Sequence, residues 1–182
     1  MRPAIKYACL FATVSILTKL VIFYRHLQFN STADVVLVSS YLLFVLLSVF
    51  FGMRGEAILL KVKPSFLINV KSGMKSAAVY ALIMAVFLFV YYKFIDTEYF
   101  SKRIADNINT LKSIDISLAD STNNKLGLIN RDAMIENQIN TAKMVFSPFY
   151  NSTFSLLGFL ITGGIYSFLI ALMQKLIFGK QS

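Results

Sequence analysis

The chain has 182 residues, of which 57% are hydrophobic and 15% are charged, and this composition excludes an ordinary soluble domain, whose helices carry a polar face. The formal net charge of +9 does not indicate a nucleic-acid partner, because the basic residues lie beside apolar runs rather than on one soluble surface. The single cysteine, Cys9, excludes an intramolecular disulfide.

Four apolar runs are each long enough to cross a bilayer. About 20 apolar residues form a helix of about 30 Å, which is the thickness of the hydrocarbon core. We therefore predict an all-α membrane protein with four transmembrane helices and an extracytoplasmic two-helix hairpin between spans three and four. The predicted single domain, 1–182, has spans at about 5–24, 35–53, 76–95 and 154–173 and an outer helical insertion at about 96–147.

The first apolar run follows Arg2 and Lys6, a pattern that is also typical of a secretory signal peptide. The run is long and is followed by Arg25, so we expect it to be retained as a span. Lys19 is the one charge placed well inside a span. We expect its long side chain to reach the outer headgroups in preference to an ion-pathway role.

Small residues recur at a spacing of four in the first and third spans and also occur in the fourth. Residues four apart share one face of a helix, and small residues let neighbouring membrane helices approach closely. The second span is rich in bulky Leu, Val and Phe, and we expect it to be the more lipid-exposed. The residues predicted to form the helix contacts are Gly73, Ala77, Ala81, Ala85, Ala4, Ala8, Ala12 and Gly158.

The connector between spans two and three, residues 54–75, is rich in lysine and arginine. Since Lys and Arg are retained on the cytoplasmic side, we predict that this connector and both termini face the cytoplasm. Its mixture of apolar and basic residues is typical of a segment lying along anionic headgroups. The residues predicted to contact anionic lipid are Lys61, Lys63, Lys71 and Lys75.

The outer segment contains two amphipathic stripes. The first runs from Phe100 to Leu111 and the second from Ile135 to Phe146, and Pro148 ends the second helix before span four. We expect two antiparallel helices that pack their stripes together and leave charged residues exposed. The predicted partner surface consists of Lys102, Arg103, Lys112, Asp120 and Glu136.

No catalytic constellation is recognisable. The one histidine, His26, has no cluster of His, Cys, Asp or Glu with metal-ligand spacing around it, and no glycine-rich phosphate loop occurs. We therefore expect no enzyme activity, no metal and no cofactor.

Three stretches carry a resemblance to a known family. They are residues 72–75 (SGMK) opening span three, residues 91–100 (YYKFIDTEYF) leaving it, and Ser147-Pro148 before a glycine-bearing last span. With this layout the chain resembles the bacterial domain-of-unknown-function family 4199. The resemblance implies a four-span bacterial inner-membrane protein and implies no activity.

Two functions remain open at this level. The first is a non-enzymatic accessory or scaffold subunit that binds membrane or periplasmic proteins through its outer hairpin and contacts membrane lipids. The alternative is a small oligomeric transporter or channel subunit, which needs polar residues facing a shared cavity. Few polar residues lie inside the spans, which favours the first function, while the oligomeric state stays open.

Overall fold

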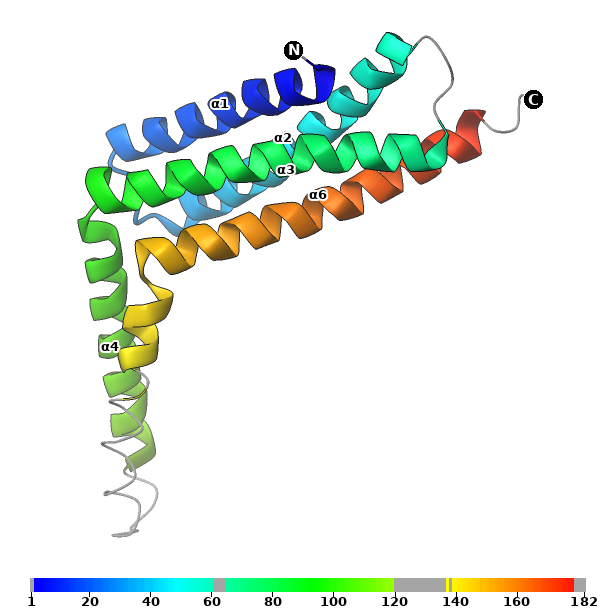
Figure 1. The fold of residues 1–182 in the computed structure, drawn as a ribbon. Coiled ribbons are helices and arrows are strands. Elements are labelled where there is room, and N and C mark those ends of the chain that lie inside the picture. Colours follow the sequence, from blue (N-terminus) through cyan, green and yellow to red (C-terminus); the bar gives the residue numbers. More distant parts are fainter. Residues whose placement is uncertain (1, 61–64, 120–136, 138, 179–182) are drawn as a thin grey trace. The chain divides into compact units, whose positions relative to one another are not determined.

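The structure is a computed structural model that describes residues 2–60, 65–119, 137 and 139–178. Four long apolar helices, each able to cross a membrane, dominate these residues, and no strand occurs among them. The predictions of an all-α fold and of four apolar spans are thus confirmed. The helices are α1 (Pro3–Tyr24), α2 (Ser31–Leu60), α3 (Phe66–Val90), α4 (Glu98–Ala119) and α6 (Pro148–Phe178), with a π-helical turn, η1 (Tyr91–Ile95), after α3 (Figure 1).

The apolar helices are longer than the hydropathy runs that predict them. Helix α3 begins at Phe66, although its apolar run begins only at residue 76. Lysines 71 and 75 interrupt the apolar run but not the helix, because lysine is a good helix former. A change from apolar to charged residues therefore marks where a helix leaves an apolar surrounding, not where the helix itself ends.

The chain divides into two compact units. The first, called the bundle here, comprises Met1–Phe87 and Phe154–Ser182, and the second comprises Leu88–Thr153 and is called the 88–153 unit. The predicted outer insertion, residues 96–147, falls within the second unit.

Within the bundle, α3 is the central helix and contacts each of the other three (Figure 1). The Ser76 hydroxyl donates to the backbone oxygen of Ala4 on α1, at 3.1 Å, and to that of Ser48 on α2, at 2.8 Å. On the side toward α6, the backbone at Gly73 lies directly against Ser167. The arrangement explains why α3 carries the largest buried share of the four apolar helices.

The expectation that the second span is the more lipid-exposed is wrong. In α2, 33% of the most apolar window is buried, against 22% in α1 and in α6. Bulky Val45 and Val49 are fully buried, and Val45 lies near Gly163 of α6, while Leu43 on the opposite face of α2 is exposed. Side-chain size alone does not indicate a lipid-facing helix, because a bulky residue fills the space that a small residue opposite leaves.

Candidate functional site

The predicted contact stripe of α3 is buried. Ala77, Ala81 and Ala85 are all buried, and a methyl group at Gly73 would come within 2.6 Å of the Ser167 hydroxyl oxygen. The same methyl group would lie 2.9 Å from the Met53 sulfur. This face of α3 therefore admits only small residues where α2 and α6 cross it.

The small residues of α1 occupy the buried face of that helix as well. Ala4, Ala8 and Ala12 are at most 1% exposed. A Cβ atom at Gly52 of α2 would lie 3.4 Å from the Ala4 Cα atom and 2.8 Å from the Ser76 hydroxyl oxygen. Helices α1, α2 and α3 thus meet at one point, where a glycine, an alanine and a serine leave no room for a larger side chain.

Gly158 does not make the predicted helix contact. The residue is exposed, and a Cβ atom placed on it would meet nothing within 4 Å. The contact is made by Gly163, where a Cβ atom would collide with the Ala77 methyl group. The buried face of α6 consists of Phe159, Gly163, Ser167 and Ala171, which are spaced by four. This spacing is visible in the sequence, but the small residues around Gly158 favoured the wrong face in the prediction.

Buried hydroxyl groups connect the helices at two levels. The Ser15 and Tyr80 hydroxyl oxygens share a hydrogen bond of 2.6 Å between α1 and α3. One level away, the hydroxyls of Ser48 and Ser76 lie 2.9 Å apart. Because these groups satisfy one another, they stabilise the bundle in an apolar surrounding, where an unpaired hydroxyl would be costly. The sequence did not predict this pairing, because a single serine or tyrosine in an apolar run does not indicate which residue it will bond.

Lys19 does not extend to the headgroups as expected. Its side chain is 2% exposed and lies on the same buried face of α1 as Ala12 and Ser15. The spacing of this face, residues 4, 8, 12, 15 and 19, places Lys19 one turn beyond the hydroxyl pair of Ser15. A charged group inside a membrane segment is a candidate functional residue.

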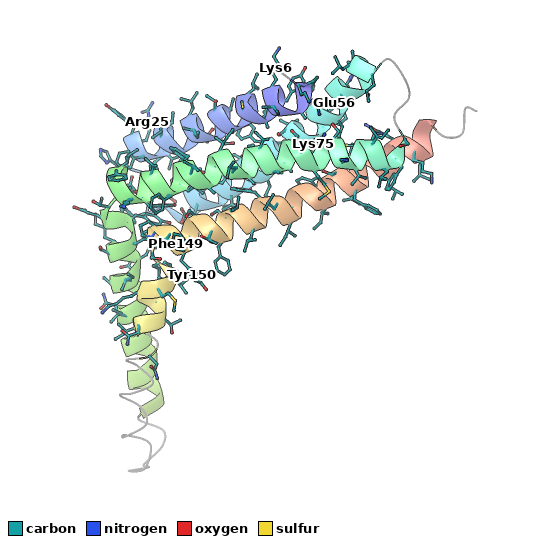
Figure 2. All side chains as sticks on the ribbon, in the orientation of Figure 1. Lys6, Arg25, Glu56, Lys75, Phe149 and Tyr150 are labelled. Atoms are coloured by element: carbon teal, nitrogen blue, oxygen red, sulfur yellow. The ribbon has the colours of Figure 1, made fainter. Side chains whose placement is uncertain are left out.

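The predicted lipid-contact residues are described in part. Lys71 and Lys75 are exposed on α3, whereas Lys61 and Lys63 lie outside the described residues. Figure 2 shows Lys75 at the same end of the bundle as Lys6 and Glu56, and Arg25 at the other end. The end of the bundle that carries Lys6 and Lys75 is therefore rich in positive charge.

The predicted partner surface is also described in part. On α4, Lys102 is exposed and forms a 3.0 Å salt bridge with Glu98, and the Arg103 guanidinium lies over the Tyr99 ring, 5.4 Å from its centroid. Lys112 lies in α4, but its side chain is not among those described. Asp120 and Glu136 lie outside the described residues.

An aromatic cluster and a buried carboxylate follow the π-helical turn. The Tyr91 hydroxyl donates to the Asp96 carboxylate at 3.1 Å, and the Asp96 backbone N–H donates to the Tyr91 backbone oxygen at 2.9 Å. Asp96 is only 4% exposed. The Tyr92 ring lies 4.6 Å from that of Phe100 and 5.1 Å from that of Tyr99, measured between centroids. These contacts fix the start of α4.

Comparison with known proteins gave one match. Residues 6–175 match the model of a family described as "Protein of unknown function (DUF4199)". No curated protein and no solved structure matches the chain.

Proposed function

We propose that this chain, which belongs to the DUF4199 family, is a non-enzymatic accessory or scaffold subunit of the bacterial inner membrane. In this proposal the bundle anchors the protein in the membrane, both termini face the cytoplasm, and the helical segment between α3 and α6 is extracytoplasmic. Partner membrane or periplasmic proteins bind the charged face of α4.

The paired hydroxyl groups and close helix contacts of the bundle are the observations that carry this proposal. A conduit needs polar groups that face a shared cavity. Here the hydroxyls of Ser15, Tyr80, Ser48 and Ser76 bond to one another or to backbone oxygens, and small residues bring the helices into direct contact. These four hydroxyl groups suit an anchor, because they stabilise the bundle by bonding within it.

The 88–153 unit supports a binding role. A few residues suffice to join two antiparallel helices, so a whole helical unit between α3 and α6 is far more than a connection requires. On α4 the apolar side includes Phe100, which is buried, while Lys102 and Asp106 are exposed one turn apart. A helix that buries one face and displays both signs of charge on the other suits recognition of a protein better than headgroup binding.

The alternative, a small oligomeric transporter or channel subunit, is favoured by one observation. Lys19 is buried within the span formed by α1, and intramembrane lysines commonly mark ion or substrate pathways. On this alternative, proteoliposomes would show an ion or proton flux above that of protein-free vesicles, and Lys19→Met would abolish it. The scaffold proposal expects no flux above the vesicle background from either protein.

Removing most of the 88–153 unit tests the scaffold proposal. Residues Lys102–Lys143 are replaced by a short Gly/Ser linker, and the protein is purified after gentle cross-linking in its native membrane. The truncated protein should insert normally and lose the proteins that co-purify with the full chain. Retention of the same partners at the same yield would overturn the proposal.

A finer pair of variants avoids a change of length. Lys102→Ala combined with Asp106→Ala removes two exposed charges one turn apart, and partner recovery should fall. Asn137→Ala combined with Thr141→Ala changes two exposed uncharged residues at the same spacing and is the matched control. An equal fall in both double variants would show that the charged face of α4 is not the binding surface.

A further inference from the structure

Every apolar helix of the bundle presents an exposed basic side chain at the same end. We call this set the basic collar. It consists of Lys6 on α1, Arg54 on α2, Lys71 and Lys75 on α3, and Lys175 on α6, all of which are exposed.

Two contacts between helices relate the collar residues of α1 and α6 to α3. The Asn69 side-chain amide donates to Gln174 at 2.9 Å, so Lys175, the next residue of α6, lies beside the first turns of α3. The bond from Ser76 to the Ala4 backbone oxygen brings Lys6 to the level of Lys75. Lys175 and Lys6 therefore both lie beside the first half of α3, Lys175 nearer its start and Lys6 further along.

The collar has a large excess of positive charge. Glu56 is the acid that shares this end of the bundle (Figure 2). The salt bridge between Lys102 and Glu98 belongs to the 88–153 unit and does not involve the collar. The collar lysines are thus not neutralised by described carboxylates of the same chain, and their charge is available to an external anion.

Lys71 and Lys75 lie on a face of α3 that is otherwise apolar. Leu67, Met74 and Leu82 are exposed on the same face, and Ala78, one turn beyond Lys75, is exposed and small. Residues four apart on a helix are neighbours about 6 Å apart, which lets two ammonium groups contact one phosphate. The apolar residues beyond them continue along the face that acyl chains would cover.

We propose that Lys71 and Lys75 bind the phosphate of an anionic phospholipid whose acyl chains lie along the exposed face of α3 past Ala78 and Leu82. Lys6 and Lys175, on the two helices that contact α3 at this level, add to the positive potential around the headgroup. The site takes a phosphodiester with attached acyl chains, not a free phosphate ion. It does not depend on the scaffold function.

Titration of the purified full chain in an uncharged detergent tests this site. Phosphatidylglycerol should bind and raise the melting temperature, whereas phosphatidylcholine should have a smaller effect. Since each lysine near an anionic headgroup contributes a comparable attraction, Lys71→Gln combined with Lys75→Gln should weaken phosphatidylglycerol binding about 30-fold. The charge-preserving pair Lys71→Arg and Lys75→Arg should keep the affinity within a few-fold.

The controls separate this site from general charge effects. Lys102→Gln combined with Lys143→Gln removes two exposed lysines elsewhere and should leave lipid binding unchanged. If the double glutamine variant at 71 and 75 does not fold, each single variant should weaken binding about fivefold. Undiminished phosphatidylglycerol binding by these variants, or equal competition by inorganic phosphate at the same concentration, would overturn the proposal.

Discussion

Ring contacts occur in both the bundle and the 88–153 unit, and in the bundle the Phe159 ring contacts those of Tyr41 and Tyr80, but small residues and paired hydroxyl groups accompany them there. In the bundle, glycine, alanine and serine bring α3 against its three neighbours, and buried hydroxyl groups bond across the helices. In the 88–153 unit, tilted contacts between tyrosine and phenylalanine rings and a surface salt bridge support the start of α4.

An apolar surrounding gives a physical reason for the close contacts and paired hydroxyl groups of the bundle. Lipid tails remove the hydrophobic drive between helices, so close van der Waals contact and interhelical hydrogen bonds must stabilise a membrane bundle. The small residues and hydroxyl pairs of the bundle are therefore the contacts expected of helices surrounded by lipid.

The largest effect should come from the aromatic cluster. Phe100 is 6% exposed and its ring contacts those of Tyr92 and Tyr99, so Phe100→Ala should cost about 3–5 kcal/mol of local stability. Phe94, 67% exposed, is the matched control, and Phe94→Ala should cost far less. Hydrogen exchange should show lost protection in α4 and unchanged protection in α1 and α2. Equal loss in both units would contradict their separate stabilisation.

A glycine pair on α6 tests the close contacts of the bundle. Gly163→Leu must displace the Ala77 methyl group, and overpacking of this kind should cost about 1–3 kcal/mol. Gly158→Leu extends into open space on the same helix and should leave the melting temperature in detergent unchanged or slightly higher. If the two variants melt alike, α6 does not pack on α3 through Gly163.

A smaller effect is expected from the buried hydroxyl groups. Ser76→Ala removes the bonds to the Ala4 and Ser48 backbone oxygens, and interhelical hydrogen bonds in membranes contribute about 0.6 kcal/mol on average and at most about 1.7. Ser39→Ala changes an exposed serine of α2 and should be neutral in the same unfolding measurement. A neutral Ser76→Ala would leave the small residues as the main support of the bundle.

The smallest effect should come from the surface salt bridge of the 88–153 unit. Glu98 and Lys102 are one turn apart and largely exposed, so their pairing should contribute about 0.3–0.5 kcal/mol. A double-mutant cycle of Glu98→Gln and Lys102→Met measures this coupling, which salt should weaken further. A coupling above 2 kcal/mol would show that water does not reach this pair.

The sequence was sufficient to predict the four spans and most of the small residues that are buried between helices, because both depend on local patterns. Runs of apolar residues predicted the four long helices, and a spacing of four predicted the burial of Ala4 and Ala81. The errors concern which face of a helix meets a neighbour. Gly158 and Gly163 are both glycines of α6, and only the position of α3 decides which of them is in contact.

Lys19 and the π-helical turn show a second limit. The position of Lys19 near the end of α1 predicted a side chain that reaches the headgroups. In the structure Lys19 lies on the same face of α1 as Ala12 and Ser15, and it is buried there. The bond from Tyr91 to Asp96 depends on a turn wider than an α-helix, for which the sequence contains no distinct signal. Both features arise from tertiary contacts rather than from local preference.

Labelling from the two sides of the membrane tests the central claim, that the bundle spans the bilayer with the start of α3 on the cytoplasmic side and α4 on the outer side. In a Cys9→Ala background, single cysteines replace Ser65 before α3 and Asn109 on α4, both of which are exposed. An impermeant thiol reagent on intact spheroplasts should modify Asn109→Cys and spare Ser65→Cys until the membrane is permeabilised. Equal modification of both cysteines in intact spheroplasts, or modification of Ser65→Cys alone, would contradict this arrangement.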